Sequence, residues 1–461
     1  MLFNSFAFLL VFLPLALLAH WAVERYQPHY RLLLLTLLSF VFYGYWDWRF
    51  VPLLALSVLI NWLVAQSFLK TRLAGAEQGW IIIGAIATNL FVLGLFKYSG
   101  FLVDAANTLG GLTLVRPEIA LPLGISFFTF HHVMYLTDLR AGLAPAYGLN
   151  RYALYIGFFP QVLAGPLVRW SELMHQLDQP PFREGWEERT ARAILLLTLG
   201  LSKKVLIGDP LSEYVNPVFA AALEGRAISV LEAWQAVLSF SFQIYFDFSG
   251  YTDMALGIAL LFGIMLPQNF NAPYRATSLQ DFWRRWHMTL SRFLRDYLYI
   301  RLGGSRGGLA LQMVALFTTM ALGGLWHGAG WTFVAWGMAH GFGLCAGVLW
   351  RRANLPCPPL LGWALTFVFV LFTWVLFRAG SFTAALAIYK AMLGFAPLGS
   401  GFKWRALVFA GGFAMLGPTS WSLVERTPLK RWVAVLLAIL FVIGLLKIGD
   451  DANYEFIYFQ F

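Results

Sequence analysis

The chain of 461 residues is 59% apolar and only 12% charged, and its mean hydropathy is +0.67. A water-soluble domain of this size cannot bury so much apolar surface, so the composition excludes a soluble enzyme and predicts an integral membrane protein. The formal charge of +10 comes from basic residues scattered at the ends of apolar segments, where cytoplasmic loops and anionic lipid head groups account for them. We therefore expect membrane lipids, and not nucleic acid, as partners.

Apolar segments recur along the whole chain. A membrane-spanning helix needs about 20 mostly apolar residues, and several segments are shorter, so we expect roughly 10 to 13 crossings together with re-entrant or interfacial pieces. The predicted fold class is an all-α integral membrane protein, with residues 1–461 as a single multi-pass domain. The candidate segments are Phe6–Val23, Leu32–Trp46, Phe50–Leu69, Trp80–Tyr98, Ala120–Leu136, Tyr152–Val168, Ala193–Gly208, Val230–Phe246, Met254–Leu266, Leu309–Trp326, Trp331–Trp350, Leu360–Phe377, Ala406–Leu416 and Val433–Lys447.

Two carboxylates, Asp247 and Asp253, lie inside apolar sequence. Buried carboxylates are costly and usually face a cavity, a partner charge or the end of a helix. The step Ser249-Gly250 suggests that the helix breaks there. In one continuous helix the two carboxylates would point about 240° apart, so they would not act as an acid/base pair. We interpret them as structural polar residues that cap a helix start or pair with arginine.

A basic stretch, Asn271–Gly308, follows. Its seven arginines against two aspartates give a net charge of +5, which favours the cytoplasmic face. Within it, Ser278 and Asp281 have the spacing of a capping box, so we expect an amphipathic surface helix to begin there and to run to the glycines after Leu302. The basic residues are Arg275, Arg284, Arg285, Arg292, Arg295, Arg301 and Arg306.

Two histidines are candidates for chemistry. His287 falls on an inward-facing stripe of the predicted helix, where a hydrogen-bonded structural role is favoured over a catalytic one. His327 lies between glycines in apolar sequence, where a substrate or another helix can approach closely. Its imidazole can take a proton from an attacking alcohol, or it can form an interhelical hydrogen bond. His340 lacks such a setting and is interpreted as structural. Cys345 and Cys357 lack metal-ligand spacing, so we predict no metal site.

Several motifs together resemble the bacterial branch of the membrane-bound O-acyltransferase family, and most closely its alginate O-acetyltransferases. The likeness runs over almost the whole chain, and the ordered set is more specific than any one motif. The motifs are Tyr245–Ala255, Asp281–Ser291, Leu294–Ile300 and Gly323–Gly328, supported by Leu121–Ser126, Phe159-Pro160, Ala164–Pro166, Asn269-Phe270, Pro273-Tyr274 and Phe456–Phe461.

The resemblance implies a ring of membrane helices around a central tunnel, with the acyl donor arriving from the cytoplasm and the acceptor hydroxyl from outside. The two histidines of the family fall on His287 and His327, and His327 matches the one regarded as catalytic. We expect acetyl-CoA as the donor and no permanently bound cofactor. Arg284, Arg285 and Arg295 are candidates to bind the phosphates of the donor, although they would serve equally to hold the helix at anionic lipids.

The predicted function is O-acetylation of an exported polysaccharide such as alginate, in the bacterial inner membrane, together with periplasmic acetyl-handling proteins and a polysaccharide synthesis and export complex. Peptidoglycan or cellulose is the alternative acceptor, because this branch shares the same motifs. A transporter or flippase is the alternative from another class. The chain shows no pair of interrupted segments in matching halves, which transporter folds often have.

Overall fold

The computed structural model describes residues 1–73, 78–450 and 457, and every regular element in these ranges is helical, as predicted. The chain forms two compact units. Unit 1 contains residues 1–197 and 254–267, and unit 2 contains residues 198–253 and 268–461. The single domain over 1–461 stays a prediction. Of the C-terminal motif Phe456–Phe461, all residues except Ile457 lie outside the described part.

Unit 1 packs its helices around phenylalanine rings. Phe8, Phe42 and Phe159 are fully buried, and the ring centroids of Phe42 and Phe159 lie 5.4 Å apart. The buried His132 has a partner, because its Nδ1 lies 2.7 Å from the hydroxyl of Tyr152. The helices are η1 (Ala7–Phe12), α1 (Leu13–Tyr26), η2 (Pro28–Tyr30), α2 (Arg31–Gly44), η3 (Trp48–Phe50), α3 (Val51–Leu73), α4 (Gly79–Gly110), α5 (Ile125–Arg140), α6 (Leu149–Gly157), α7 (Phe159–Val162), α8 (Trp170–Leu173), η4 (Met174–Asp178) and most of α9 (Trp186–Ser202).

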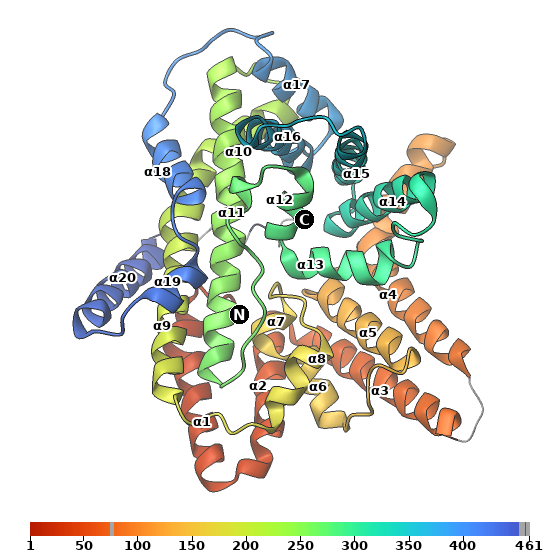
Figure 1. Cartoon of the computed structure of the whole chain (residues 1–461), viewed down its shortest axis with the longest axis vertical. Helices are drawn as coiled ribbons and strands as arrows, with labels where there is room; N and C mark the ends of the chain where they lie inside the picture. Colours follow the sequence, from red (N-terminus) through yellow and green to blue (C-terminus); the bar gives the residue numbers. More distant parts are fainter. Residues whose placement is uncertain (74–77, 451–456, 458–461) are drawn as a thin grey trace. The chain divides into compact units, whose positions relative to one another are not determined.

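Unit 2 carries both candidate histidines. Its longest helix, α11, is the long light-green helix of Figure 1, and the last turns of α11, from Met254, belong to unit 1. The helices are η5 (Lys203–Gly208), α10 (Asp209–Leu223), α11 (Val230–Leu261), η6 (Pro273–Arg275), α12 (Leu279–Arg285), α13 (Met288–Phe293), η7 (Leu294–Tyr299), α14 (Gly308–His327), α15 (Trp331–Arg352), α16 (Pro359–Arg378), α17 (Phe382–Met392), α18 (Trp404–Met415), α19 (Ser420–Arg426) and α20 (Arg431–Asp450).

Fewer helices than the expected 10 to 13 crossings have the length and apolar character of a full membrane span. In the described part, seven helices are long and apolar enough to cross a membrane, or eight if the bent pair α18 and α19 is one span. The predicted segment Tyr152–Val168 is not one helix, because the chain leaves helical geometry at Phe158, shortly before Pro160. The predicted segments Val230–Phe246 and Met254–Leu266 are joined in one helix, α11, which ends at Leu261.

The break predicted at Ser249-Gly250 is therefore wrong. Gly250 serves close packing instead, since a Cβ at this position would lie 2.7 Å from the carbonyl oxygen of Gly200 on α9. The glycine lets α9 and α11 approach each other closely, while α11 continues through this position as a helix.

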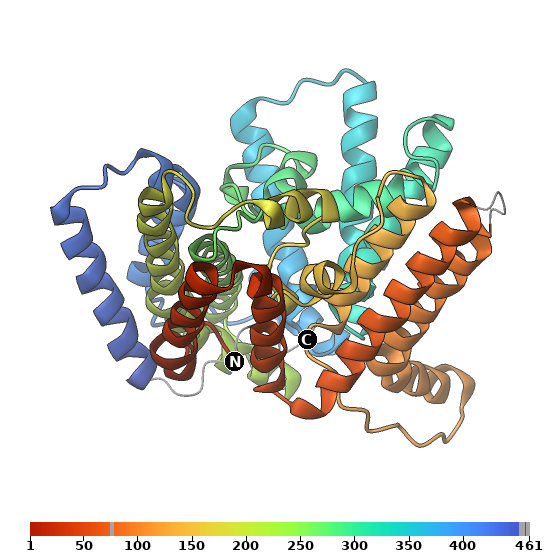
Figure 2. The same cartoon turned by 90° about the horizontal axis from the view of Figure 1, so that it is seen from below.

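Glycines also join α14 to α15, which lie side by side in Figures 1 and 2. A Cβ on Gly324 would lie 2.9 Å from the Cα of Gly337, and a Cβ on Gly337 would lie 2.3 Å from the carbonyl oxygen of Met320 on α14. Real Cβ atoms essentially never come so close to backbone, so both positions require glycine. This contact fixes how the C-terminal end of α14, which carries His327, lies against α15.

We expect Gly324→Ala to lower the stability of the protein by about 1–3 kcal/mol, because the added methyl group must push the two helices apart. The thermal midpoint of unfolding, measured in one detergent, checks this. Gly412→Ala on α18 is the matched control, since a Cβ there meets nothing within 4 Å. Equal midpoints for the two variants would contradict the close contact.

Candidate active site

His327 is the last residue of α14, and its side chain is buried, with 6% of its surface exposed. Its ring centroid lies 5.1 Å from that of Trp336 and 5.3 Å from that of Phe377, in edge-on contacts. The next residue, Gly328, is extended, and a Cβ on it would overlap the ring of Phe333. The glycine-rich flank thus lets the chain turn into α15 directly after the histidine.

His287 lies between α12 and α13 in the left-handed region, with φ +43° and ψ +54°. A non-glycine residue in this conformation is uncommon and is often found at functional sites. The prediction of one continuous helix is wrong here, because the helix that begins at the predicted cap, Ser278, ends at Arg285. Periodicity could not reveal the break, since the apolar spacing continues across it.

Two backbone hydrogen bonds hold this break. The N–H of Met288 donates to the carbonyl oxygen of Asn269 (2.9 Å), and the N–H of Asn271 donates to the carbonyl oxygen of Arg285 (2.9 Å). The neighbouring segment thus supplies partners for backbone groups that a helix would have satisfied internally.

The side chain of His287 is fully buried, as its predicted inward position required. Burial lowers the pKa of His287 to about 3, because the charged form loses its hydration. The imidazole is therefore neutral at any pH near neutrality. Its Nδ1 lies 3.2 Å from Oδ1 of Asn269, and its ring lies edge-on to Phe248 at 4.8 Å.

The structure brings the two predicted histidines together, because the ring centroids of His287 and His327 lie 6.5 Å apart. Trp326 lies beside both rings, with centroids 6.2 Å from His287 and 4.9 Å from His327. In this largely aromatic and apolar enclosure, one imidazole can take a proton and the other can hold a hydrogen bond with little competition from water.

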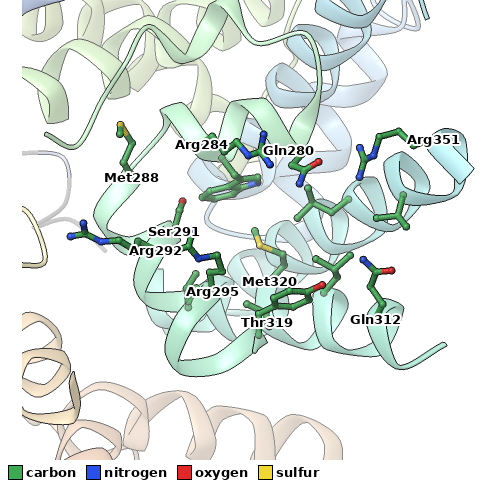
Figure 3. Close-up of a pocket in the computed structure, with 16 residues that line it drawn as sticks. Gln280, Arg284, Met288, Ser291, Arg292, Arg295, Gln312, Thr319, Met320 and Arg351 are labelled. Carbon is green, nitrogen blue, oxygen red and sulfur yellow. The ribbon is translucent and has the colours of Figure 1, made fainter. Parts of the chain in front are cut away.

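A cavity of about 450 Å³ opens between α12, α13, η7, α14 and α15 of the same unit (Figure 3). Its wall combines apolar side chains with four arginines: Arg284, Arg292, Arg295 and Arg351. Such a cavity suits a ligand that has both an anionic and an apolar part.

The three predicted arginines are placed differently. Arg284 and Arg295 line the cavity, whereas Arg285 does not. Arg285 pairs with Asp281 at 2.9 Å, and Arg295 pairs with Asp296 at 2.7 Å. Arg351, which sequence reasoning missed, also lines the cavity; its only signal was a basic residue at the end of an apolar segment.

One face of α14 carries both a residue of the cavity wall and His327. Thr319 lines the cavity, and Thr319, Gly323 and His327 follow one another at steps of four, which places them on the same face of the helix. The rise from Thr319 to His327 is about 12 Å. Gly323 lies between them on this face, and the side chain of Leu294, which also lines the cavity, packs over it, since a Cβ on Gly323 would lie 3.2 Å from Cδ1 of Leu294.

His340 is held by two hydrogen bonds. Its Nδ1 accepts from the indole N–H of Trp283 (3.2 Å), so Nε2 carries the proton and donates to Thr373 Oγ1 (3.1 Å). The hydroxyl of Thr373 in turn donates to the carbonyl oxygen of Val370. Because Trp283 lines the cavity, His340 fixes part of the cavity wall.

The two aspartates pair with lysines. Asp247 lies 2.6 Å from Nζ of Lys204 and accepts the N–H of Ile457, and Asp253 lies 2.7 Å from Nζ of Lys203. The expected arginine partners and the helix caps were therefore wrong, because each carboxylate lies within α11 and pairs with its own lysine.

In the described ranges, no group of three or more His, Cys, Asp or Glu side chains is placed to hold a metal ion. Unit 2 thus presents a buried two-histidine site and an arginine-lined cavity in a multi-pass helical membrane protein. The model of the membrane-bound O-acyltransferase family matches residues 40–388. The chain belongs to this family and is an O-acyltransferase.

Three relatives are similar over most of the chain. A peptidoglycan O-acetyltransferase of Helicobacter pylori is 39% identical over 425 residues, covering 86% of this chain and 80% of that protein. A probable alginate O-acetylase of Pseudomonas aeruginosa is 39% identical over 409 residues, covering 86% and 75%. A probable alginate O-acetylase of Pseudomonas putida is 35% identical over 503 residues, covering the whole of both chains.

Proposed function

We propose that this protein is an O-acetyltransferase of the bacterial cytoplasmic membrane that moves acetyl from acetyl-CoA towards a hydroxyl of an exported polysaccharide. The observation that carries the proposal is the buried pair His287 and His327 in the same unit as an arginine-lined cavity, whose residue Thr319 lies two turns before His327 on α14. The names of the relatives support acetyl as the acyl group and a cell-surface polymer as the acceptor. Alginate is our first candidate for that polymer, and peptidoglycan or cellulose is the alternative.

His327 acts as the general base in this proposal. It takes the proton of the acceptor hydroxyl while the oxygen forms a bond to the acetyl carbonyl carbon. The tetrahedral intermediate then collapses, the carbon–sulfur bond breaks, and the proton passes from His327 to the departing thiolate of CoA. The pKa of His287 is too low for it to exchange protons near neutral pH, so we assign it to orienting a substrate.

Basic residues on one side of unit 2 support entry of the donor from the cytoplasm. The loops 300–307 and 353–358 lie at the same side of this unit in Figure 2. Arg301, Arg306, Arg351 and Arg352 are on or next to these loops. Basic loops favour the cytoplasmic side. α14 starts there, and His327 lies about 28 Å further along its axis, towards the side on which an exported polymer would arrive. Periplasmic acetyl-handling proteins and a polysaccharide synthesis complex are the partners that fit this direction.

The proposal predicts vectorial transfer. In vesicles that contain the purified protein, labelled acetyl-CoA supplied on the side of the 353–358 loop should yield acetyl ester on an acceptor supplied on the other side. Alginate, peptidoglycan fragments and cellulose oligomers are compared as acceptors, each with and without the proteins encoded by the neighbouring genes. Failure of labelled acetyl to leave acetyl-CoA under any of these conditions would refute acetyl-CoA as the donor.

We expect Arg284→Gln to raise the apparent KM for acetyl-CoA about tenfold, because a hydrogen bond to a charged group contributes about 1.5–3 kcal/mol. Arg284 lines the cavity and makes no ion pair among the residues that the structure describes. The measurement is made in nanodiscs of neutral lipid, where attraction to anionic head groups is absent.

Arg285→Gln is the matched control, because Arg285 is next in sequence but lies outside the cavity wall. An unchanged KM for Arg284→Gln, together with poorer membrane insertion in cells, would leave lipid anchoring as the role of this arginine.

A further inference from the structure

Asn269 is a buried residue that contacts His287 and has no role in the reaction proposed above. It is 1% exposed and lies before α12, in the segment that pairs with the break at His287. Its Oδ1 is 3.2 Å from Nδ1 of His287, 3.2 Å from the backbone nitrogen of Thr289 and 2.9 Å from Thr289 Oγ1. One amide oxygen thus serves three polar groups, two of which belong to the backbone and side chain of a single threonine.

The orientation of this amide follows from its partners. The backbone N–H of Thr289 can only donate, so the atom of Asn269 that faces it must be the oxygen and not the nitrogen. Among the residues that the structure describes, Nδ2 of Asn269 has no hydrogen-bond partner. Burying an amide N–H without an acceptor costs about 1–3 kcal/mol. Because the side chain keeps this orientation despite that cost, the three contacts of Oδ1 must be what holds it in place.

The orientation of Asn269 decides the protonation of His287. An amide oxygen can only accept, so Nδ1 of His287 must carry the proton and donate it. Because burial keeps the imidazole neutral, the other nitrogen, Nε2, then has a lone pair and can only accept. A ring nitrogen of this kind can bind an O–H or N–H of a substrate and cannot serve as a proton donor.

We infer that Asn269 is a positioning residue for acyl transfer, which holds His287 as the Nδ1–H tautomer so that Nε2 accepts a hydrogen bond from a substrate beside His327. The inference rests on the proposed function, because it assumes that the two histidines form the active site. The separation of the two ring centroids, 6.5 Å, suits this division of labour. A direct bond of about 3 Å between ring nitrogens would bring the centroids to about 5 Å, so at the observed separation the two imidazoles do not hydrogen-bond to each other.

The tautomer can be measured without any assay of activity. In protein labelled with ¹⁵N-histidine, solid-state NMR separates protonated from unprotonated Nδ1 and Nε2, and the His287 signals are assigned by their loss in His287→Gln. We expect Nδ1 of His287 to be protonated and Nε2 to be unprotonated in the native protein. A signal from protonated Nε2, or from exchange between tautomers, overturns the inference.

Variants of Asn269 then test the link to catalysis. Asn269→Leu removes the oxygen, so we expect a mixed tautomer and a fall in kcat of at least tenfold, with a smaller change in KM. Thr289→Val is the control, because it removes one contact of Oδ1 but keeps the backbone N–H and should retain the native tautomer and most of kcat. An unaltered tautomer or unaltered kcat in folded Asn269→Leu also overturns the inference.

Asn269→Asp keeps an acceptor at the same place and avoids reliance on a variant that loses the contact altogether. It should retain the Nδ1–H tautomer and rescue kcat at high pH. The carboxylate also favours the imidazolium form, so it raises the pKa of His287. As the pH is lowered, Asn269→Asp should therefore lose activity at a higher pH than the native protein does, because a protonated Nε2 no longer accepts a hydrogen bond.

The ring neighbours of His287 include Phe248, Trp326 and the titratable His327. The pH at which each variant loses activity is therefore compared with the pH at which His327 titrates, which the same NMR experiment measures.

If Asn269→Asp loses activity at the same pH as the native protein, the inference is overturned. Failure of the proposed function looks different: His327→Ala would retain acetyl transfer while the tautomer of His287 stays as expected.

Discussion

His327→Ala should abolish acetyl transfer while leaving the protein folded and inserted. General base catalysis typically contributes about 10²–10⁴ in rate, so kcat should fall by at least that factor. The change removes a buried ring that contacts Trp336 and Phe377, and some loss of stability is expected as well. The measurement is acetyl ester formed per folded protein, with folding followed by the thermal midpoint in the same detergent.

His340→Gln is the matched control for this variant. His340 is also a buried histidine in unit 2, but its two ring nitrogens bond to Trp283 and Thr373 and its role is to fix the cavity wall. We expect a lower thermal midpoint with most of kcat retained. Near-normal acetylation by His327→Ala at a normal protein level would refute the role of His327 as the base.

The sequence was most informative where a local pattern determines the structure. The cap at Ser278, the inward position of His287 and most of the long apolar helices follow from hydrogen bonding and periodicity within a few residues. The choice of His327 as a candidate also came from a local signal, since a histidine between glycines in apolar sequence is unusual. The resemblance of the chain to the family then connected His327 with His287.

Features that depend on distant segments could not be predicted. The break at His287 is held by Asn269 and Asn271, and the local spacing of apolar residues shows no sign of it. Likewise, no local signal distinguishes Arg284 from Arg285, although one lines the cavity and the other pairs with Asp281. The cavity exists only because α12, α14 and α15 pack together.

The partners of Asp247 illustrate the same limit. The cost of burying a carboxylate predicted a cation nearby, and arginine was the expected one. The cation is Lys204, which lies in η5, a π-helical segment between α9 and α10. Lys204 also pairs with Asp209, five residues further on, because a π-helix brings residues i and i+5 together.

We expect Lys204→Met to destabilise the protein strongly. The side chain of Lys204 is fully buried, and those of Asp209 and Asp247 are 10% and 3% exposed, so the change leaves two carboxylates without their cation. Removing one member of a buried ion pair typically costs about 3–5 kcal/mol. The thermal midpoint in detergent should fall accordingly, and so should the yield of folded protein.

A neighbouring lysine provides the comparison. Lys203→Met also removes an ion pair, with Asp253, but these two side chains are 16% and 15% exposed, so water compensates part of the loss and the midpoint should fall less. The double variant Lys204→Met/Asp247→Asn should recover part of the loss caused by Lys204→Met, because it removes one of the two uncompensated charges while Asn can still accept the N–H of Ile457. If the double variant is less stable than Lys204→Met alone, the destabilisation does not come from the buried charge of Asp247, and packing of the lysine stem in η5 must account for it.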